Sequence, residues 1–375
     1  MGKGKSTCAL FLDLSKAFDT IDHKILLRKL MQAYGIRGKQ NSFFGSYLIN
    51  RKQCTKVNNY SSNFQTNECG VPHGSVMGPL LFLIYVNDLP CTSSFQTTLF
   101  ADDTSLHLSH KDIKTLQLNV ENELDKVDTW MRSNRLSINY NKTAYMILNA
   151  TRSQNCNFEI SMNGLRIQQT DSSKYLGVII DNKLSWKPQI SSLCGKLSQA
   201  CGVVCKIRHL GDMKILHLIY FSLFHSHLHH CIIDWGRTYK TVIQPVQVLQ
   251  NRILKCMTFS KRTSSANNIF KLLKILKVSD LYQINLEKFM YKCRLLPISC
   301  PLLLITCFQN YTAHVIMAQD NKFQEIIIIN VLELIMVKKM LQYVGPVPWG
   351  CISNNTKMLP LHMFSYRVKL RQLAG

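Results

Sequence analysis

Three aspartates in this 375-residue chain are spaced so that they could share divalent metal ions. Asp102 and Asp103 are adjacent, between the strand-like runs 97–99 and 104–108, which predicts a hairpin with both carboxylates at its tip. Two neighbouring ionised carboxylates repel each other, and a bound cation removes that penalty. Asp13 ends the apolar run 8–12, which is long enough for a buried strand. The set predicts a two-metal site, whose ions, about 3.5–4 Å apart, would clamp both oxygens of an in-line phosphoryl displacement.

Three stretches that contain these aspartates resemble the motifs of one enzyme family. Residues 11–19 (FLDLSKAFD) resemble motif A of reverse transcriptases, residues 70–82 (GVPHGSVMGPLLF) resemble motif B, and residues 100–103 (FADD) resemble motif C. The match to motif C alone is a weak signal, but the three motifs together in this order are specific for the family. The residues in these motifs are similar to those of non-LTR, LINE-type retrotransposons of the jockey and chicken-repeat kind.

The resemblance implies roles for further residues. It implies two Mg²⁺ or Mn²⁺ ions, with metal-binding positions at Asp13, Leu14, Asp102 and Asp103, the three aspartates being catalytic. It implies nucleotide-binding positions at Phe18, His73, Gly74 and Lys142, and a primer grip at Tyr175, Leu176 and Gly177. In the family, the aromatic residue at the place of Phe18 excludes a 2′-hydroxyl, and Gln usually stands where this chain has His73. The alternative to a nucleotide-binding role is ordinary core packing for Phe18 and a position as a surface lysine for Lys142.

The hydrophobic pattern predicts the elements that hold these residues. Helices are expected over residues 17–34, 80–86 and 113–131, the last with Glu121, Glu123, Asp125 and Asp128 on its solvated face. An antiparallel pair is expected over 52–57 and 63–67, and a hairpin with an Asn-Gly turn over 160–168. From residue 187 onward the pattern is almost all helical, with one helix spanning 215–235.

These elements predict an α+β fold. The resemblance implies a right-hand polymerase palm, an antiparallel sheet with covering helices, followed by a mostly helical thumb and a C-terminal region. We expect residues 1–182 to be the palm with partial fingers, 183–298 a basic thumb-like region, and 299–375 a retrotransposon tail region. Because the family's fingers normally precede motif A, we expect an N-terminally truncated chain with little or no activity of its own.

The charge of the chain favours a polyanionic partner. The net charge is +23, and residues 191–375 carry 23 Lys and Arg against 7 Asp and Glu, while residues 1–190 carry 22 against 15. A basic helical half suits a nucleic-acid backbone, although a merely basic, soluble surface is the alternative. The resemblance implies an RNA template, a DNA primer and deoxynucleoside triphosphates as partners, and leaves protein partners unspecified.

The cysteines and histidines add little to this interpretation. The 14 cysteines form no CxxC pair, and Cys194, Cys201 and Cys205 have the helical spacing of core residues. No secretory signal or membrane span is expected, so the thiols should be reduced and the protein intracellular, in the nucleus or the cytoplasm. His225 and His229 have the spacing of helix-borne metal ligands, but no third ligand is convincingly placed.

The leading hypothesis is therefore an RNA-directed DNA polymerase domain. The alternative is a catalytically inactive relic of a retrotransposon polymerase that still binds nucleic acid. A third possibility is a transcribed pseudogene product without a selected role. The three aspartates favour the polymerase, because a binding module has no need of them.

Overall fold

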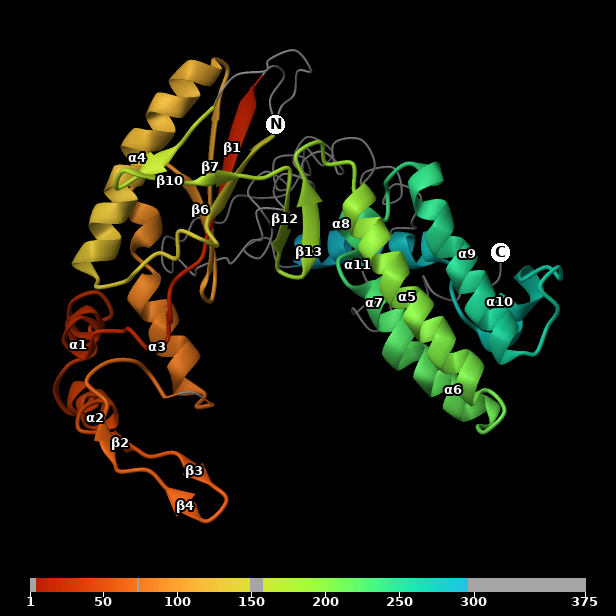
Figure 1. Ribbon diagram of the computed structural model, residues 1–375, viewed down its shortest axis with the longest axis horizontal. Helices are drawn as coiled ribbons and strands as arrows, with labels where there is room; N and C mark the ends of the chain where they lie inside the picture. The colour runs from red at the N-terminus through yellow and green to blue at the C-terminus, as the bar shows by residue number, and fades with distance from the viewer. Residues whose placement is uncertain (1–4, 73, 149–157, 296–375) are drawn as a thin grey trace. The chain divides into compact units, whose positions relative to one another are not determined.

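The computed structural model describes residues 5–72, 74–148 and 158–295 (Figure 1). The chain divides into two compact units, with the boundary between Ser173 and Lys174. Helices and strands are mixed in the first unit, whereas helices predominate in the described part of the second. Each unit is considered by itself below.

A five-stranded sheet forms the first unit, with strand order β11-β8-β1-β7-β6. Its members are β1 (Ser6–Leu12), β6 (Gln96–Phe100), β7 (Asp103–His110), β8 (Ala144–Leu148) and β11 (Gln168–Gln169). All neighbouring strands are antiparallel except β11 and β8, which are parallel. The central position of β1 agrees with its sequence, since a strand buried on both faces reads as a continuous apolar run.

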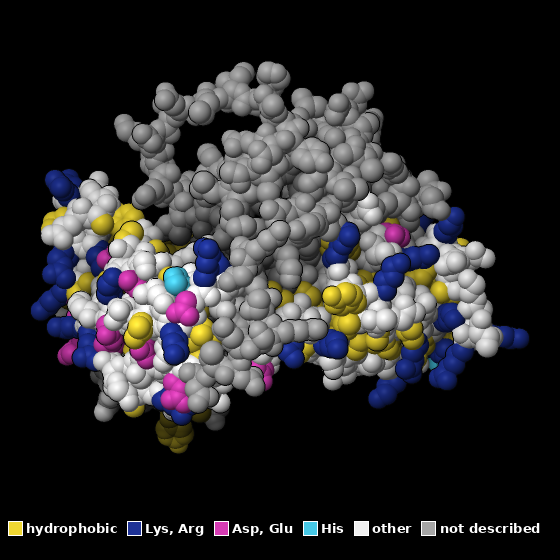
Figure 2. Space-filling model, turned by 90° about the horizontal axis from the view of Figure 1, so that it is seen from above, with side chains coloured by type: hydrophobic (Ala, Val, Ile, Leu, Met, Phe, Trp, Pro, Cys, Tyr) yellow, Lys and Arg dark blue, Asp and Glu magenta, His cyan; other side chains and the backbone are white. Residues whose placement is uncertain are grey.

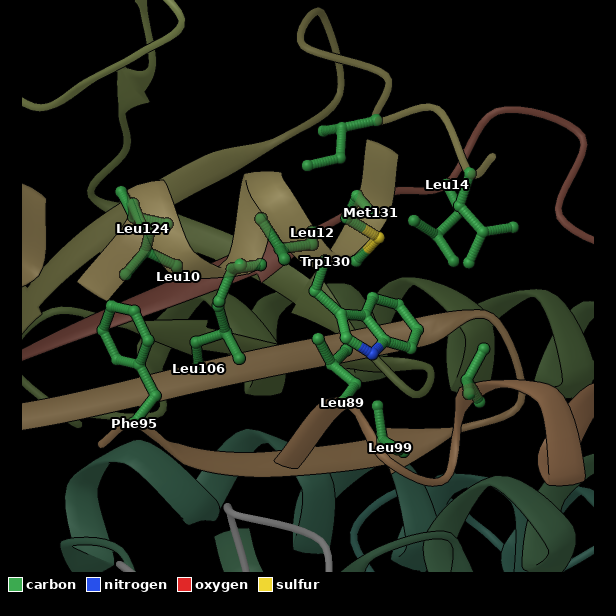
Figure 3. Packing of buried hydrophobic residues seen from close by; sticks show 14 of the residues in the cluster. Leu10, Leu12, Leu14, Leu89, Phe95, Leu99, Leu106, Leu124, Trp130 and Met131 are labelled. Atoms are coloured by element: carbon green, nitrogen blue, oxygen red, sulfur yellow. The ribbon is translucent and has the colours of Figure 1, made fainter. Parts of the chain in front are cut away.

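One face of the sheet packs against helix α4 (Ile113–Ser133). Leu10, Leu12 and Leu106 lie between the strands and the helix, where they belong to one core cluster with Leu124 and Met131 (Figure 3). Each of these side chains is at most 3% exposed. Truncating such a leucine to alanine typically costs about 2–5 kcal/mol, so this layer is a principal source of stability for the unit.

Helix α4 confirms the predicted amphipathic helix, with one correction. Asp112 caps its N-terminus by accepting a hydrogen bond from the backbone N–H of Thr115 at 2.8 Å. Asp128 was expected on the solvated face but is buried. Its carboxylate is satisfied there by Nε of Arg132 at 2.8 Å and by Nδ2 of Asn163 at 2.6 Å, which removes the usual penalty for a buried charge.

Helix α1 (His23–Gln32) begins later than the sequence pattern predicted. Residues 17–22, expected to be helical, form turns, and Lys16 just before them has φ +49°. Asp22 caps the helix by accepting a hydrogen bond from the backbone N–H of Ile25 at 2.9 Å. The apolar positions before the cap face the core without helical backbone, which is why periodicity alone gave the wrong start.

The segment between α1 and the β6–β7 hairpin contains two α-helices, one short 3₁₀ helix and an exposed β-ribbon. Helix α2 (Gly38–Leu48) precedes the ribbon, and α3 (Met77–Val86) and the short η1 (Leu89–Cys91) follow it. The ribbon consists of two short ladders: β2 (Lys52–Gln53) pairs with β5 (Gln65–Thr66), and β3 (Lys56–Val57) pairs with β4 (Tyr60–Ser61). This confirms the predicted antiparallel pair and the buried helix.

The predicted Asn-Gly hairpin is also confirmed. Strands β9 (Ser161–Met162) and β10 (Leu165–Arg166) are joined by Asn163 and Gly164. Both turn residues have positive φ, +55° and +72°, as a type I′ turn requires. The turn follows from local chemistry alone.

The second unit begins with a hairpin and continues as helices. The hairpin pairs β12 (Ser172–Tyr175) with β13 (Val178–Asp181). The described helices are α5 (Lys187–Ile207), α6 (Met213–Ile219), η2 (Tyr220–His225), α7 (Ser226–His229), α8 (Ile232–Trp235), α9 (Lys240–Met257), α10 (Asn267–Leu273) and α11 (Val278–Leu295).

The single helix expected over residues 215–235 is broken in the structure. Its middle part, η2, is a π-helix, and Cys231 adopts a left-handed conformation with φ +50° between α7 and α8. Trp235 explains the break, because its Nε1 donates to the backbone carbonyl of His230 at 2.9 Å and its ring is fully buried. Among the residues that the structure describes, no helix is both long and apolar enough to cross a membrane.

Candidate active site

Asp13 and Asp103 lie at the same end of two paired strands. In the β1–β7 ladder Leu12 pairs with Thr104, and extending the register by one residue puts Asp13 opposite Asp103. The β6–β7 hairpin closes with Phe100 paired to Asp103. The turn between them consists of Ala101, which has φ +51°, and Asp102. The predicted hairpin with both carboxylates at its tip is therefore confirmed.

The electrostatics of Asp103 reflect these neighbours. Partial burial raises the pKa of its carboxyl group, and the negative charges of Asp102 and Asp13 raise it further. A carboxylate with a raised pKa beside two others is an environment that favours a cation. Carboxylate oxygens are also the ligands that Mg²⁺ prefers.

Asp13 is held by the turn before β8. Its backbone N–H donates to Oγ1 of Thr143 at 3.3 Å, and its carbonyl oxygen accepts from the N–H of Asn139 at 2.8 Å. Nζ of Lys142 lies 3.8 Å from Oδ2 of Asp13, and both side chains are substantially exposed. The sequence had singled out Lys142 but not Asn139 and Thr143, although both stand in the same short run.

Leu14 continues this connection. It forms an isolated bridge with Ile138 and its side chain is buried in the core. An apolar side chain offers no ligand atom, so the backbone carbonyl oxygen is the donor that Leu14 could contribute to a metal ion.

The turn after Asp13 is hydrogen-bonded to the motif B loop. The carbonyl of Phe18 accepts from the N–H of Val71 at 2.9 Å, and that of Ile21 accepts from the N–H of Gly70 at 2.8 Å. Gly70 has φ +85°, and a Cβ atom there would lie 2.8 Å from the carbonyl oxygen of Asp19. A glycine is needed at this point because both the conformation and the close approach exclude a side chain.

The other nucleotide-binding candidates differ in their surroundings. The ring of Phe18 is half-buried, with its centroid 4.7 Å from that of Phe82 on α3. Gly74 is exposed, has φ +76°, and has no atom within 4 Å of the place where a Cβ would stand. His73 lies outside the described residues. Phe18 therefore packs as the alternative interpretation expected, which leaves its contact with a nucleotide a prediction.

Leu176 and Gly177 form the turn of the β12–β13 hairpin, and Tyr175 is the last residue of β12. Leu176 and Gly177 have positive φ, +47° and +83°, and Tyr175 is buried. A Cβ on Gly177 would lie 3.1 Å from Nε2 of His230. The hairpin is thus a tight, well-defined structure, and its role as a primer grip stays a prediction.

Within 5–72, 74–148 and 158–295, no three His, Cys, Asp or Glu side chains lie close enough together to hold a metal ion. The ring centroids of His225 and His229 are 6.0 Å apart. The aspartates at the end of β1 and at the hairpin tip have the right chemistry for Mg²⁺, but their carboxylates must reorient to converge on one.

A comparison with protein families identifies the N-terminal half of the chain. Residues 1–180 match the family described as reverse transcriptase (RNA-dependent DNA polymerase). The match marks a reverse transcriptase domain that takes up just under half of the 375 residues. The reverse transcriptase domain contains all three candidate aspartates, the motif B loop and the β12–β13 hairpin up to Ile180.

Curated relatives confirm the retrotransposon resemblance. The chain is 25% identical over 264 residues to a probable RNA-directed DNA polymerase from transposon BS of Drosophila melanogaster, covering 67% of this chain and 29% of that protein. It is 25% identical over 300 residues to the RNA-directed DNA polymerase from mobile element jockey of the same species, covering 76% and 32%. The relatives are non-LTR retrotransposon polymerases.

The chain spans about a third or less of the length of these relatives. Among solved structures, apo telomerase from Candida tropicalis aligns with 74% of this chain and 47% of that chain. The sequence identity is 12% and the TM-score is 0.38, which is too low to define a shared fold.

Proposed function

We propose that this chain carries out RNA-directed DNA synthesis, in which a primer 3′-hydroxyl attacks the α-phosphate of a deoxynucleoside triphosphate. The observation that carries the proposal is the position of Asp13 opposite Asp103, beside Asp102 at the hairpin tip, inside a reverse transcriptase domain. The reaction needs negative charge to be compensated where the phosphoryl group is transferred. Asp13, Asp102 and Asp103 all lie at this end of the sheet.

Two Mg²⁺ or Mn²⁺ ions are the proposed cofactors, held by Asp13, Asp102 and Asp103 with the backbone of Leu14. The all-oxygen donor set and the raised pKa of Asp103 support this. When bound, such ions stabilise the charge that develops on the attacking and leaving oxygens. The protein's own contribution is to hold Asp13 at the strand end through Asn139 and Thr143.

Phe18, His73, Gly74 and Lys142 are the proposed nucleotide-binding residues. The Phe82 contact holds the Phe18 ring in place, so the ring can act as a fixed wall against a sugar 2′-hydroxyl. The open space around Gly74 lets a ligand approach the backbone closely. Lys142, whose side chain is 70% exposed, can turn its ammonium group from Asp13 towards a triphosphate.

The proposed division of the chain into domains follows the family. Residues 1–182 would be the palm with partial fingers and residues 183–298 a helical thumb, with Tyr175, Leu176 and Gly177 gripping the primer. The mixed sheet and helices of the first unit and the helices of the second support this. The third region, residues 299–375, lies outside the described residues.

Nucleic acid is the proposed partner of the second unit. Residues 174–295 carry 19 Lys and Arg against 5 Asp and Glu. In the right-hand part of Figure 2, dark blue Lys and Arg side chains outnumber the magenta acidic ones. Such a surface attracts the phosphate backbone of an RNA template and a DNA primer, whatever their sequence.

A second candidate function is nucleic-acid binding without polymerisation. The observation in its favour is that Lys142, rather than a converged carboxylate set, stands beside Asp13. If the ammonium group has taken over the role of a metal ion, the domain would bind template and primer but not copy.

Primer extension on an RNA template with Mg²⁺ or Mn²⁺ tests both candidates. We expect at most weak extension by the intact chain, and a further loss of at least about 100-fold in Asp13→Asn, as for removal of one preorganised catalytic group. Asp125→Asn is the matched control, because Asp125 is exposed on α4. Binding of the RNA–DNA duplex by the intact chain without extension would favour the second candidate, and extension that survives Asp13→Asn would refute the assigned site.

A further inference from the structure

Two cysteines from different helices of the second unit meet at one point. Cys205 lies near the end of α5 and Cys256 near the end of α9. Their Sγ atoms are 2.7 Å apart, although the residues are 51 positions apart in the sequence. Both carry free thiols. Cys205 has the helical spacing of a core residue, but its side chain is exposed, while that of Cys256 is buried.

This separation is much shorter than ordinary packing requires. Two non-bonded sulfur atoms in van der Waals contact are well over 3 Å apart, whereas an S–S bond is about 2.05 Å long. The helices therefore present the two sulfurs at a distance that needs little movement to form a bond. Cys201, one turn earlier on α5, shows the contrasting case, because its Sγ contacts the carbonyl oxygen of Leu249 at 3.7 Å.

The surroundings of the pair include one cation. Nη1 of Arg208 lies 3.8 Å from Sγ of Cys256, and its guanidinium group is held 4.8 Å over the ring of Phe259. Burial and the neighbouring Cys205 raise the pKa of Cys256 to about 11, and Arg208 acts in the opposite direction. A positive charge beside a sulfur stabilises its thiolate, the form that reacts.

We propose that Cys205 and Cys256 form a reversible modification site, a dithiol that a peroxide converts to a disulfide linking α5 to α9. The inference is independent of the proposed polymerase. The accessible Cys205 and the partly shielded Cys256 fit the two roles of such a site, an attacking and a resolving thiol.

Hydrogen peroxide can oxidise the Cys205–Cys256 dithiol to the disulfide in two steps. The thiolate of Cys205 attacks one peroxide oxygen, the O–O bond breaks, and the leaving hydroxide takes a proton to become water, which leaves a sulfenic acid on Cys205. The sulfur of Cys256 then attacks the Cys205 sulfur, the S–O bond breaks, and the departing hydroxide takes the Cys256 proton as a second water. The two thiols together lose two electrons and two protons, which the peroxide gains. A dithiol reductant reverses the link by thiol–disulfide exchange.

The test is peptide mapping of the full chain after oxidation. The reduced protein is treated with stoichiometric hydrogen peroxide, free thiols are blocked with N-ethylmaleimide, and the linked peptides are identified by mass spectrometry. We expect a Cys205–Cys256 peptide pair lighter by two hydrogen atoms, formed before any other link and reversed by dithiothreitol. Closing a loop of this length should also raise the Tm of the oxidised protein by about 5 °C.

Three variants separate the proposal from general thiol oxidation. Cys256→Ser should leave a sulfenic acid on Cys205 that dimedone traps, and Cys205→Ser should lose the link. Cys194→Ser, the matched control on α5, should keep it. If the wild-type protein forms no Cys205–Cys256 link while other thiols oxidise, or links the exposed Cys54, Cys69 and Cys91 equally often, the proposal is overturned. The wild-type map decides the question even if a variant fails to fold.

Discussion

Nζ of Lys142 lies 3.8 Å from Oδ2 of Asp13, so a protein ammonium group stands beside the carboxylate assigned to metal binding. The carboxylate of Asp13 is 38% exposed and the Lys142 side chain 70%. A pair this exposed contributes about 0.2–1 kcal/mol. The ion pair is therefore strong enough for Lys142 to compete measurably with a divalent ion for Asp13, and weak enough for a bound ion to displace Lys142.

Lys142→Gln should therefore strengthen metal binding in the absence of nucleotide. The competing charge is removed, and we expect Mn²⁺ to bind up to about fivefold more tightly, the equivalent of a pair worth 1 kcal/mol. Electron paramagnetic resonance titration measures free Mn²⁺ directly. The control is Lys126→Gln, which removes an exposed lysine paired with Glu123 on α4. Unchanged or weaker binding in Lys142→Gln would show that Lys142 does not compete with the metal.

Asp103→Asn should stabilise the metal-free protein at neutral pH. The pKa of Asp103 is raised in the folded state, so folding disfavours its ionised form. Between the ordinary carboxyl pKa and the raised one, the folded state binds more protons, and this group's contribution to stability falls as the pH rises. We expect a gain of about 0.5 kcal/mol at pH 7, the scale of a partly exposed site.

Thermal unfolding of wild type and Asp103→Asn across the acid range checks this sign. The gain should disappear below the ordinary carboxyl pKa, where both states are protonated. Added Mg²⁺ should reduce it as well, because the ion stabilises the wild-type carboxylate. A variant that is less stable than wild type at pH 7 would contradict the electrostatic account.

His107→Leu should remove an acid sensitivity of the first unit. Burial lowers the pKa of His107 to about 3, and neither ring nitrogen has a hydrogen-bond partner. The unfolded chain protonates this histidine near its ordinary pKa, so the stability of the wild type should fall as the pH drops from about 6.5 to 3. At about 1.4 kcal/mol per pKa unit the loss amounts to several kcal/mol.

Urea unfolding of both proteins at a series of pH values measures that slope. The Leu variant should be more stable at every pH in this interval, with a flatter profile. His110→Leu is the control, since His110 is half-exposed in the same strand. Parallel profiles for wild type and His107→Leu would mean that His107 is not buried as a neutral ring.

Gly70→Ala should destabilise the junction between the two motif loops. The residue has φ +85°, and its new methyl group would meet the backbone of Asp19 at 2.8 Å. A strained conformation of this kind costs about 1–3 kcal/mol before the clash is counted. Thermal unfolding should show the loss, whereas Gly195→Ala in the middle of α5, where a Cβ meets nothing within 4 Å, should be neutral or stabilising. Equal Tm values for the two variants would refute the steric argument.

Tyr60→Ala should weaken binding of single-stranded RNA. Tyr60 is 84% exposed on the β-ribbon, and Phe64 nearby is 72% exposed. Residues 37–67 contain five Lys and Arg and no acidic residue. Stacking of a base on an exposed aromatic ring is worth about 1–3 kcal/mol, so the affinity should fall about tenfold or more. Fluorescence anisotropy with a labelled oligonucleotide measures it, with Leu118→Ala on α4 as the control; equal affinities would exclude the ribbon from the RNA contact.

The start of α1 and the burial of Asp128 differ from the sequence predictions for the same physical reason. Helix α1 starts at His23 because the Asp22 side chain caps the Ile25 amide, and an apolar pattern does not record where a cap forms. Asp128 can be buried because Nδ2 of Asn163, from a hairpin distant in sequence, donates a hydrogen bond to its carboxylate. In each case a specific hydrogen bond outweighed the average preference that periodicity expresses.

The sequence by itself determined the parts that depend on local chemistry. The strand-like runs 97–99 and 104–108 and the adjacent aspartates were enough to predict the hairpin and its tip, and the Asn163-Gly164 pair was enough to predict a type I′ turn. The order of the three motifs was enough to predict the family that residues 1–180 match. These features are short-range, because turn conformation and strand alternation act over a few residues.

Only the tertiary structure decided which distant residues meet. The position of Asp13 opposite Asp103, the contact of Lys142 with Asp13, and the meeting of Cys205 and Cys256 each join residues 50 or more positions apart. The burial of His107 likewise depends on strands from elsewhere in the chain. Such pairs are set by sheet register and helix packing, and a hydrophobic pattern specifies which face of an element is buried without specifying its partner.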